Sequence, residues 1–216
     1  MNIYHWLMEL LFPPKCVLCG ALLQSGETDL CRSCRTDAPE YPNHKIKLQF
    51  LDSFAAVWYY EGNVRGSLLR YKFRNARSYS VSYGKILAMK LLNEYPDGFD
   101  LLTWVPVSRL RKLRRGYDQV ELLAKAVGSE LGMTPVPTLK KIRNNRPQSR
   151  QKDAAARRAN VLGAYRIVGD AQIAGKRILL LDDILTTGAT AGECARMLLS
   201  AGAKEVHCAA VAAARK

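Results

Sequence analysis

The sequence predicts an α/β protein, with a parallel sheet flanked by helices and a small cysteine-rich module in front of it. Apolar runs of strand length alternate with amphipathic helical segments from residue 54 to residue 212, and this alternation is typical of parallel sheets. Near the beginning, four cysteines form two Cys-x-x-Cys pairs, which indicates a separate metal-binding unit. A polar stretch over 41–51 separates the parts, so we predict an N-terminal module over 1–45 and a main domain over 46–216.

The first twelve residues alternate apolar and polar side chains in a way that is compatible with one or two helical turns, stopped by Pro13 and Pro14. Their polar face is not basic, which favours a helix packed on the body over a membrane-surface anchor. No stretch approaches the roughly 18 consecutive apolar residues of a membrane span, and the start lacks a basic segment of the secretory type. We expect a cytoplasmic protein without a membrane span.

The cysteine spacing Cys-x2-Cys-x11-Cys-x2-Cys offers four thiolates in two tight hairpins, an arrangement that suits tetrahedral zinc. The predicted zinc ligands are Cys16, Cys19, Cys31 and Cys34. We predict a structural, folding role for the ion, because so short a segment cannot build a sufficient core without metal. A redox pair or an iron–sulfur cluster is the alternative, and the two-residue gaps match zinc ribbons better. Cys194 and Cys208 are interpreted as core residues of a helix and a strand.

The first half of the main domain begins with an apolar strand over 54–60. Helices are predicted over 65–73 and 81–92 from their amphipathic pattern. A second apolar strand over 101–107 is followed by a strongly basic segment and then by a helix over 118–131 that glycine ends. The predicted order after the second strand is therefore strand, basic loop, helix.

The second half contains the most apolar strand, an Ile and Leu run over 176–182 that suits a central parallel strand buried on both faces. A helix over 191–200 and a strand over 205–212 follow it. Before this strand, residues 140–158 are almost free of apolar side chains, so we predict a mobile loop with a short helix near 154–158.

The sharpest functional signal is the segment 178–190, Ile-Leu-Leu-Leu-Asp-Asp-Ile-Leu-Thr-Thr-Gly-Ala-Thr. In open parallel sheets, ligands bind beyond the carboxyl ends of the strands, where this segment delivers two acids. Two adjacent charges are costly unless a partner offsets them, and ribose hydroxyls or hydrated Mg²⁺ would do so. The alternative is that the acids only cap a turn or the following helix.

The loop after the acids supplies hydroxyls, backbone N–H groups and a flexible glycine at the entrance to a helix, so donors and the positive end of the helix dipole converge on an anion. A phosphate group fits that place. The segment lacks the Gly-Lys-Ser/Thr of nucleotide-triphosphate loops and the three-glycine spacing of dinucleotide folds. The predicted ligand-binding residues are Asp182, Asp183, Thr186, Thr187, Gly188, Ala189 and Thr190.

The chain carries 33 Lys and Arg against 19 Asp and Glu, a formal net charge of +14, which suggests polyanionic partners. Most of the excess lies in two segments, 109–115 and 140–158. The first follows a predicted strand, where a second anion site would lie in a parallel sheet, and its cations are Arg109, Arg111, Lys112, Arg114 and Arg115. Nucleic-acid phosphates or a plain solvated basic face are the alternatives. Tyr117 is the first candidate for stacking on a base.

The segment 178–190 resembles the signature of type I phosphoribosyltransferases over all 13 of its residues. In that family the acid pair meets the ribose hydroxyls and the loop holds the 5-phosphate. The resemblance implies that the main domain has the phosphoribosyltransferase fold and binds phosphoribosyl pyrophosphate with Mg²⁺. The cations of 109–115 would then hold the pyrophosphate group. The loop over 140–158 would either close over the substrate or extend a nucleic-acid-binding surface.

The chain as a whole is similar to the ComF family of competence proteins. The resemblance rests on the segments 11–16, 71–74, 105–107, 114–119, 158–161 and 163–165, together with the two cysteine pairs and the acid-pair loop. The family pattern more often shows Asn where Asp118 stands. The resemblance implies handling of incoming single-stranded DNA in natural transformation, with competence-machinery proteins as partners. An active phosphoribosyltransferase of small-molecule metabolism is the alternative, and the sequence names no acceptor.

Overall fold

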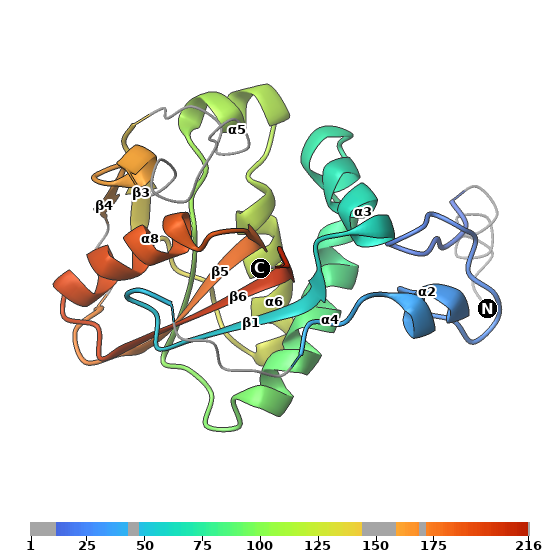
Figure 1. Cartoon of the computed structure of the whole chain (residues 1–216), viewed down its shortest axis with the longest axis horizontal. Helices are drawn as coiled ribbons and strands as arrows, with labels where there is room; N and C mark the ends of the chain where they lie inside the picture. The colour runs from blue at the N-terminus through green and yellow to red at the C-terminus, as the bar shows by residue number, and fades with distance from the viewer. Residues whose placement is uncertain (1–11, 43–47, 144–158, 169–171, 216) are drawn as a thin grey trace.

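A computed structural model describes residues 12–42, 48–143, 159–168 and 172–215. Within these ranges, the main sheet consists of β1 (Ser53–Tyr59), β2 (Leu101–Trp104), β5 (Arg177–Leu185) and β6 (Glu205–Ala213), in the order β1-β6-β5-β2. Every pairing in it is parallel (Figure 1). The predicted α/β class with a parallel sheet is confirmed.

Helices cover both faces of this sheet. The helices α3 (Gly62–Phe73), α4 (Tyr79–Glu94) and α6 (Gln119–Leu131) pack with Leu179 and Leu181 of β5 on one face. The helix α8 (Ala189–Ser200) packs with the alternate residues of the same strand on the other face. None of the helices in the described ranges is both long enough and apolar enough to cross a bilayer.

The central strand β5 is longer than predicted and contains both acids. It runs to Leu185, because β6 continues beside it and pairs Asp182 with Ala210 and Leu185 with Ala213. On its other side, β2 ends at Trp104 instead of residue 107, where the chain reaches Pro106, which has no N–H to donate. The sheet therefore leaves one edge of β5 unpaired with β2 at the level of the two carboxylates.

The basic segment after β2 is a helix, α5 (Arg109–Arg115), and the prediction of a loop is wrong. The Ser108 hydroxyl accepts a hydrogen bond from the Arg111 N–H at the first turn. Gly116 ends the helix in the left-handed conformation, with φ of 74°. Caps at both ends thus allow a seven-residue helix in spite of its repelling charges.

A small second sheet replaces part of the predicted mobile loop. The strand β3 (Leu139–Lys141) pairs antiparallel with β4 (Tyr165–Ile167), so the first two lysines of the segment 140–158 lie in a strand. The remainder of that segment from residue 144, including the predicted short helix, lies outside the described residues. The helix predicted over residues 1–12 also lies outside them, except for Phe12.

The cysteine-rich module packs on the face of α3, at the right of Figure 1, and includes the short helix α2 (Arg32–Asp37). Val17 and Leu18 are almost fully buried in the same core as α3 and α4. The Ser67 hydroxyl donates to the carbonyl of Val17, and the Arg70 guanidinium donates to the carbonyl of Leu18. The module and the sheet domain therefore share one core through α3.

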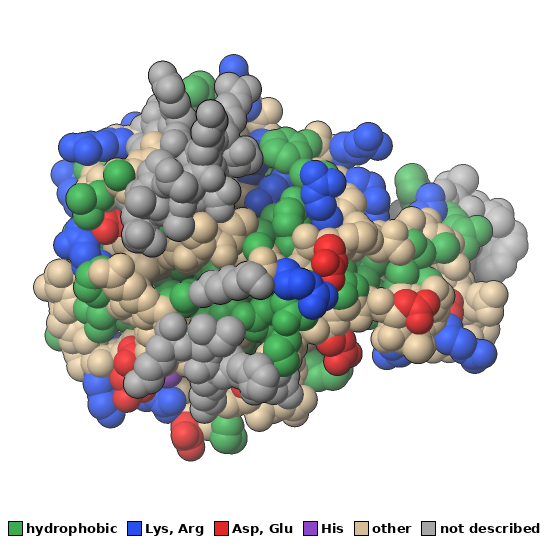
Figure 2. Space-filling model, viewed as in Figure 1, with side chains coloured by type: hydrophobic (Ala, Val, Ile, Leu, Met, Phe, Trp, Pro, Cys, Tyr) green, Lys and Arg blue, Asp and Glu red, His purple; other side chains and the backbone are tan. Residues whose placement is uncertain are grey.

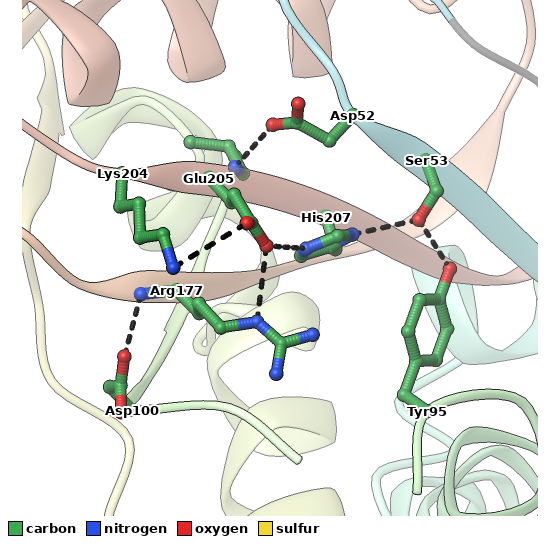
Figure 3. A network of polar contacts seen from close by, with 9 residues as sticks. Asp52, Ser53, Tyr95, Asp100, Arg177, Lys204, Glu205 and His207 are labelled. Carbon is green, nitrogen blue, oxygen red and sulfur yellow. Dashed lines mark hydrogen bonds and ion pairs between the residues drawn. The ribbon is translucent and has the colours of Figure 1, made fainter. Parts of the chain in front are cut away.

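A polar network fastens the amino ends of three strands (Figure 3). The Ser53 hydroxyl lies 2.8 Å from His207 Nδ1 and 2.7 Å from the Tyr95 hydroxyl, and Glu205 lies 3.2 Å from His207 Nε2 and 3.1 Å from Arg177 Nε. Serine, histidine and a carboxylate recur in hydrolytic triads, but the Ser53 side chain is buried and its hydroxyl has two partners. The network is therefore structural and leaves the opposite end of the sheet for ligands.

Candidate ligand-binding site

A cavity of about 930 Å³ opens at the carboxyl end of the sheet. It is bounded by the end of β5, by α3 and α5, by the segment after β2 and by the small β3–β4 sheet. This is the position at which open parallel sheets bind ligands, because the strand ends diverge there. Both acids of β5, together with Thr186 and Thr190, line it. The predicted loop and the acid pair thus meet in one cavity.

Asp183 is held on both of its carboxylate oxygens by protein groups. Lys72 Nζ lies 2.8 Å from Oδ1, and Gln119 Nε2 donates to Oδ2 at 3.0 Å. Arg115 donates in turn to the amide oxygen of Gln119 at 2.7 Å. The Asp183 side chain is 5% exposed, so this is a buried, charge-assisted network. Sequence reasoning gave Lys72 no role in the site, although the segment 71–74 was one of the family landmarks.

Asp182 is half-buried and turns toward the cavity. Its Oδ1 accepts the N–H of Asp183 at 2.8 Å. Burial, and after it the charge of Asp183, raises the pKa of Asp182 well above the usual range of a carboxyl group. Asp182 therefore keeps its proton to a higher pH than an exposed acid. Its carboxyl group is also accessible to a ligand hydroxyl from the cavity.

The threonine loop forms a small hollow of about 20 Å³ beside Asp182, lined by Thr186, Gly188, Ala189 and Thr190 among others. Gly188 precedes α8 with φ of 76°, and its carbonyl accepts the first hydrogen bond of the helix from Gly192 at 2.7 Å. The hollow lies at the beginning of a twelve-residue helix, where the dipole favours an anion. Thr187 lines neither cavity, and its hydroxyl oxygen lies 3.4 Å from the Ala189 nitrogen.

The five cations of the first basic segment divide into two groups on the surface of α5. Arg111, Arg114 and Arg115 line the cavity. Lys112 instead pairs with Glu121 at 2.9 Å, and Arg109 is exposed outside the cavity lining. The structure therefore brings three of the five predicted anion ligands to the site.

Two further cations enter the cavity from other elements. Lys141 of β3 lies 3.1 Å from the Tyr165 hydroxyl and over its ring, and burial lowers the pKa of this lysine. Arg65 reaches the cavity from α3. Among the described residues, six cationic side chains and two carboxylates line the cavity. In Figure 2, Lys and Arg side chains are visible where α3 lies.

Tyr117 is packed into the protein, contrary to the expectation that it is available to stack on a base. Its ring is 6% exposed, its hydroxyl donates to the carbonyl of Tyr71, and the Arg77 guanidinium lies 4.8 Å from the ring centroid. The more exposed aromatic at the cavity is Phe73, which is 66% exposed and lies beneath Arg115 with 5.0 Å between ring centroid and guanidinium carbon.

Asp118 is the N-cap of α6. Its Oδ1 accepts hydrogen bonds from the N–H groups of Val120 and Glu121, and its Oδ2 accepts one from Val107 at 3.2 Å. The side chain thus ties the segment after β2 to the start of the helix. An Asn oxygen can accept the two bonds from the start of the helix, but its NH2 group cannot accept the Val107 N–H, so Asp makes one bond here that Asn cannot.

The four cysteines of the module form a site that fits zinc. The sulfur atoms of Cys16, Cys19, Cys31 and Cys34 all lie within 4.8 Å of one another. Cys19 Sγ and Cys31 Sγ are 3.7 Å apart, and a tetrahedral ion with bonds of about 2.3 Å places its sulfurs roughly 3.8 Å apart. All four metal ligands would be protein side chains, as in structural zinc sites. The amide of Asn63 on α3 lies 3.9 Å from Cys34 Sγ.

Comparisons with known proteins find a matching family for each of the two parts of the chain. Residues 121–216 match the phosphoribosyl transferase domain, and residues 7–45 match the double zinc ribbon domain. Competence protein F of Haemophilus influenzae is 22% identical, over 89% of this chain and 94% of its own length. Competence protein ComFC of Bacillus subtilis is 27% identical, over 87% of this chain and 72% of its own length.

Among solved structures, glutamine phosphoribosylpyrophosphate amidotransferase from Bacillus subtilis is 24% identical over 65% of this chain, with a TM-score of 0.41. The chain covers 30% of that enzyme.

The parallel sheet, the acid pair on its central strand and the threonine loop define a protein of the phosphoribosyltransferase fold, with a zinc ribbon attached. The similarity to the competence proteins extends over both parts in one chain. Over both parts, the chain resembles the ComF family. The resemblance stated from the sequence is thereby confirmed.

Proposed function

We propose that the cavity binds phosphoribosyl pyrophosphate. In this proposal the 5-phosphate lies in the threonine loop, a ribose hydroxyl meets Asp182, and the diphosphate lies among Arg111, Arg114 and Arg115. The observation that carries the proposal is the combination of a helix-start hollow and a strongly cationic wall in one cavity at the carboxyl end of the sheet. In this proposal, the Mg²⁺ that we expected from the sequence is bound only by the diphosphate oxygens of the ligand.

Calorimetry with phosphoribosyl pyrophosphate and with ribose 5-phosphate tests this assignment. Arg111→Ala combined with Arg114→Ala removes two cationic side chains that form no ion pair within the described residues. We expect the diphosphate ligand to lose at least about tenfold in affinity while ribose 5-phosphate changes little, because only the former carries the second anion. Arg109→Ala, on the same helix outside the cavity, is the matched control. Equal losses in the control and the double variant would remove the proposed diphosphate site.

We further propose that the protein binds single-stranded DNA along the same cationic wall and acts in DNA uptake with competence-machinery proteins. The names of the relatives point to competence. The surface agrees with a nucleic-acid chain, because the aromatic side chain of Phe73 exposes two thirds of its area at the cationic cavity. Single strands are bound by such combinations of cations and exposed flat side chains, without reading of sequence.

Fluorescence anisotropy with a labelled single-stranded oligonucleotide at low and moderate salt tests the DNA proposal. The double variant Arg111→Ala, Arg114→Ala is expected to weaken binding about tenfold at low salt and to flatten the salt dependence. Lys85→Ala, an exposed lysine on α4 away from the cavity, is the control and should bind like the unmodified protein. If the unmodified protein shows no binding at low salt, the DNA proposal fails.

The size of the cavity favours one alternative, an active phosphoribosyltransferase of small-molecule metabolism. A volume of about 930 Å³ lies at the upper end of ligand pockets, and it leaves room for an acceptor beside the donor. Two results together would favour this alternative over DNA handling. The protein would release pyrophosphate when a nucleobase is added, and it would not bind oligonucleotides.

A further inference from the structure

The two carboxylates at the end of β5 raise the question of which cation balances them. Adjacent acids in a partly buried place need such a partner, and Mg²⁺ in proteins takes oxygen ligands in near-ideal octahedral geometry. In this chain the place at Asp183 is already occupied by the Lys72 ammonium, 2.8 Å from Oδ1. Oδ2 accepts from Gln119, so both oxygens of Asp183 are engaged.

Lys72 is fixed in this position by its helix. The residue before it, Tyr71, is fully buried and donates its hydroxyl proton to the carbonyl of Gln119. The contact therefore ties α3 to the start of α6, directly beside the Gln119 amide that meets Asp183. The Lys72 side chain is 19% exposed and lines the cavity. Because Tyr71 anchors the helix at this point, the Lys72 side chain leaves from a fixed backbone position and its ammonium reaches Asp183.

The remaining charges around the cavity also oppose a protein-bound divalent cation. Asp182 is the second carboxylate of the site, and burial and its charged neighbour favour its neutral form. The other charged side chains of the lining are cationic, among the described residues. A site with excess positive charge attracts an anionic ligand directly and repels a free cation. The residues present do not fit a Mg²⁺ site of their own.

We propose that Lys72 serves as the resident cation of the donor site, so that the protein binds its phosphorylated ligand without needing Mg²⁺. Asp183 is then a positioning residue that orients Lys72 and Gln119, and Asp182 is the acid that contacts the ligand. This inference rests on the proposed binding of phosphoribosyl pyrophosphate and names the cation at that same site.

Calorimetry of the full chain with phosphoribosyl pyrophosphate, in EDTA and in excess Mg²⁺, tests the inference. For the unmodified protein we expect dissociation constants within about threefold of each other in the two conditions. Lys72→Met should bind at least about tenfold more weakly in EDTA and should recover in Mg²⁺, because removal of the ammonium frees Asp183 for a metal. Lys141→Met removes a cation of the same cavity that does not touch Asp183. Any affinity for phosphoribosyl pyrophosphate that this variant loses should not be restored by Mg²⁺.

Titration of Mn²⁺ into the ligand-free proteins, followed by electron paramagnetic resonance, gives an independent readout. Binding of the ion by Lys72→Met and not by the unmodified protein or by Lys72→Arg supports the inference, and Lys72→Arg also separates charge from folding. If the unmodified protein binds phosphoribosyl pyrophosphate only with Mg²⁺, the Lys72 inference fails while the proposed function stands. If it binds the ligand in neither condition, the proposed function itself fails.

Discussion

Replacement of Cys16 by Ser is expected to abolish zinc binding and to lower the free energy of unfolding by about 3 kcal/mol or more. The apolar residues of the two hairpins, such as Val17 and Leu18, pack on the core of the main domain, and the four clustered thiolates are placed to join the hairpins through one metal ion, so metal binding contributes directly to their folding free energy. Cys16 is fully buried, and its backbone closes the first hairpin through bonds to Gly20 and Ala21. A serine there leaves three ligands and a buried hydroxyl.

Metal analysis and urea denaturation measure this effect. Cys208→Ala is the matched control, because it removes a buried thiol of β6 that is not one of the four clustered cysteines. The control should keep one zinc ion per chain and lose about 1 kcal/mol from the smaller side chain. Chelation of the unmodified protein should reproduce the Cys16→Ser result. A zinc-free variant that unfolds at the same urea concentration as the unmodified protein would contradict a structural role for the metal.

Gly188→Val is expected to abolish binding of ribose 5-phosphate and to lower the free energy of unfolding by about 3 kcal/mol. The backbone at Gly188 has φ of 76°, which a β-branched residue adopts only under strain. A Cβ at this position would also lie 2.9 Å from Leu48 Cδ1, so Leu48 or the loop must shift. Because the loop lines the small hollow beside Asp182, a shift there removes the arrangement of donors that an anion needs.

Gly98→Val separates backbone strain from loss of the site. Gly98 has φ of 63°, and a Cβ there meets no atom within 4 Å. This control should lose about 1 to 2 kcal/mol from the strained backbone and should bind ribose 5-phosphate normally. Calorimetry and thermal denaturation of both variants provide the comparison. Retention of ribose 5-phosphate binding by Gly188→Val would show that the 5-phosphate does not lie in the threonine loop.

The elements that the sequence predicted well are those set by local pattern. The beginning of β5 and both ends of helix α6 were predicted to within one residue, because burial on both faces of a strand, or on one face of a helix, determines the order of apolar residues. The extension of β5 through Asp183 to Leu185 was missed. It depends on pairing with β6, which lies further along the chain and leaves no local signal at the acids.

The composition of the site was harder to predict than its location. In a loop, the five cations of the segment 109–115 would be equivalent. In a helix, the repeat of about 3.6 residues places them on different sides. Arg111, Arg114 and Arg115 lie three and four residues apart and share the cavity side, whereas Arg109 and Lys112 lie on another side. The role of Lys72 depends on a contact between α3 and β5, which no spacing within one segment reveals.

Helix α3 has the zinc ribbon on one side and the cavity on the other. Ser67 and Arg70 bond to the ribbon, and Lys72, two residues after Arg70, reaches Asp183 of β5. If zinc binding and ligand binding are coupled through α3, the same coupling free energy changes both affinities by the same factor. In that case removal of zinc weakens binding of the proposed phosphate ligand, and the bound ligand raises the affinity for zinc to the same extent.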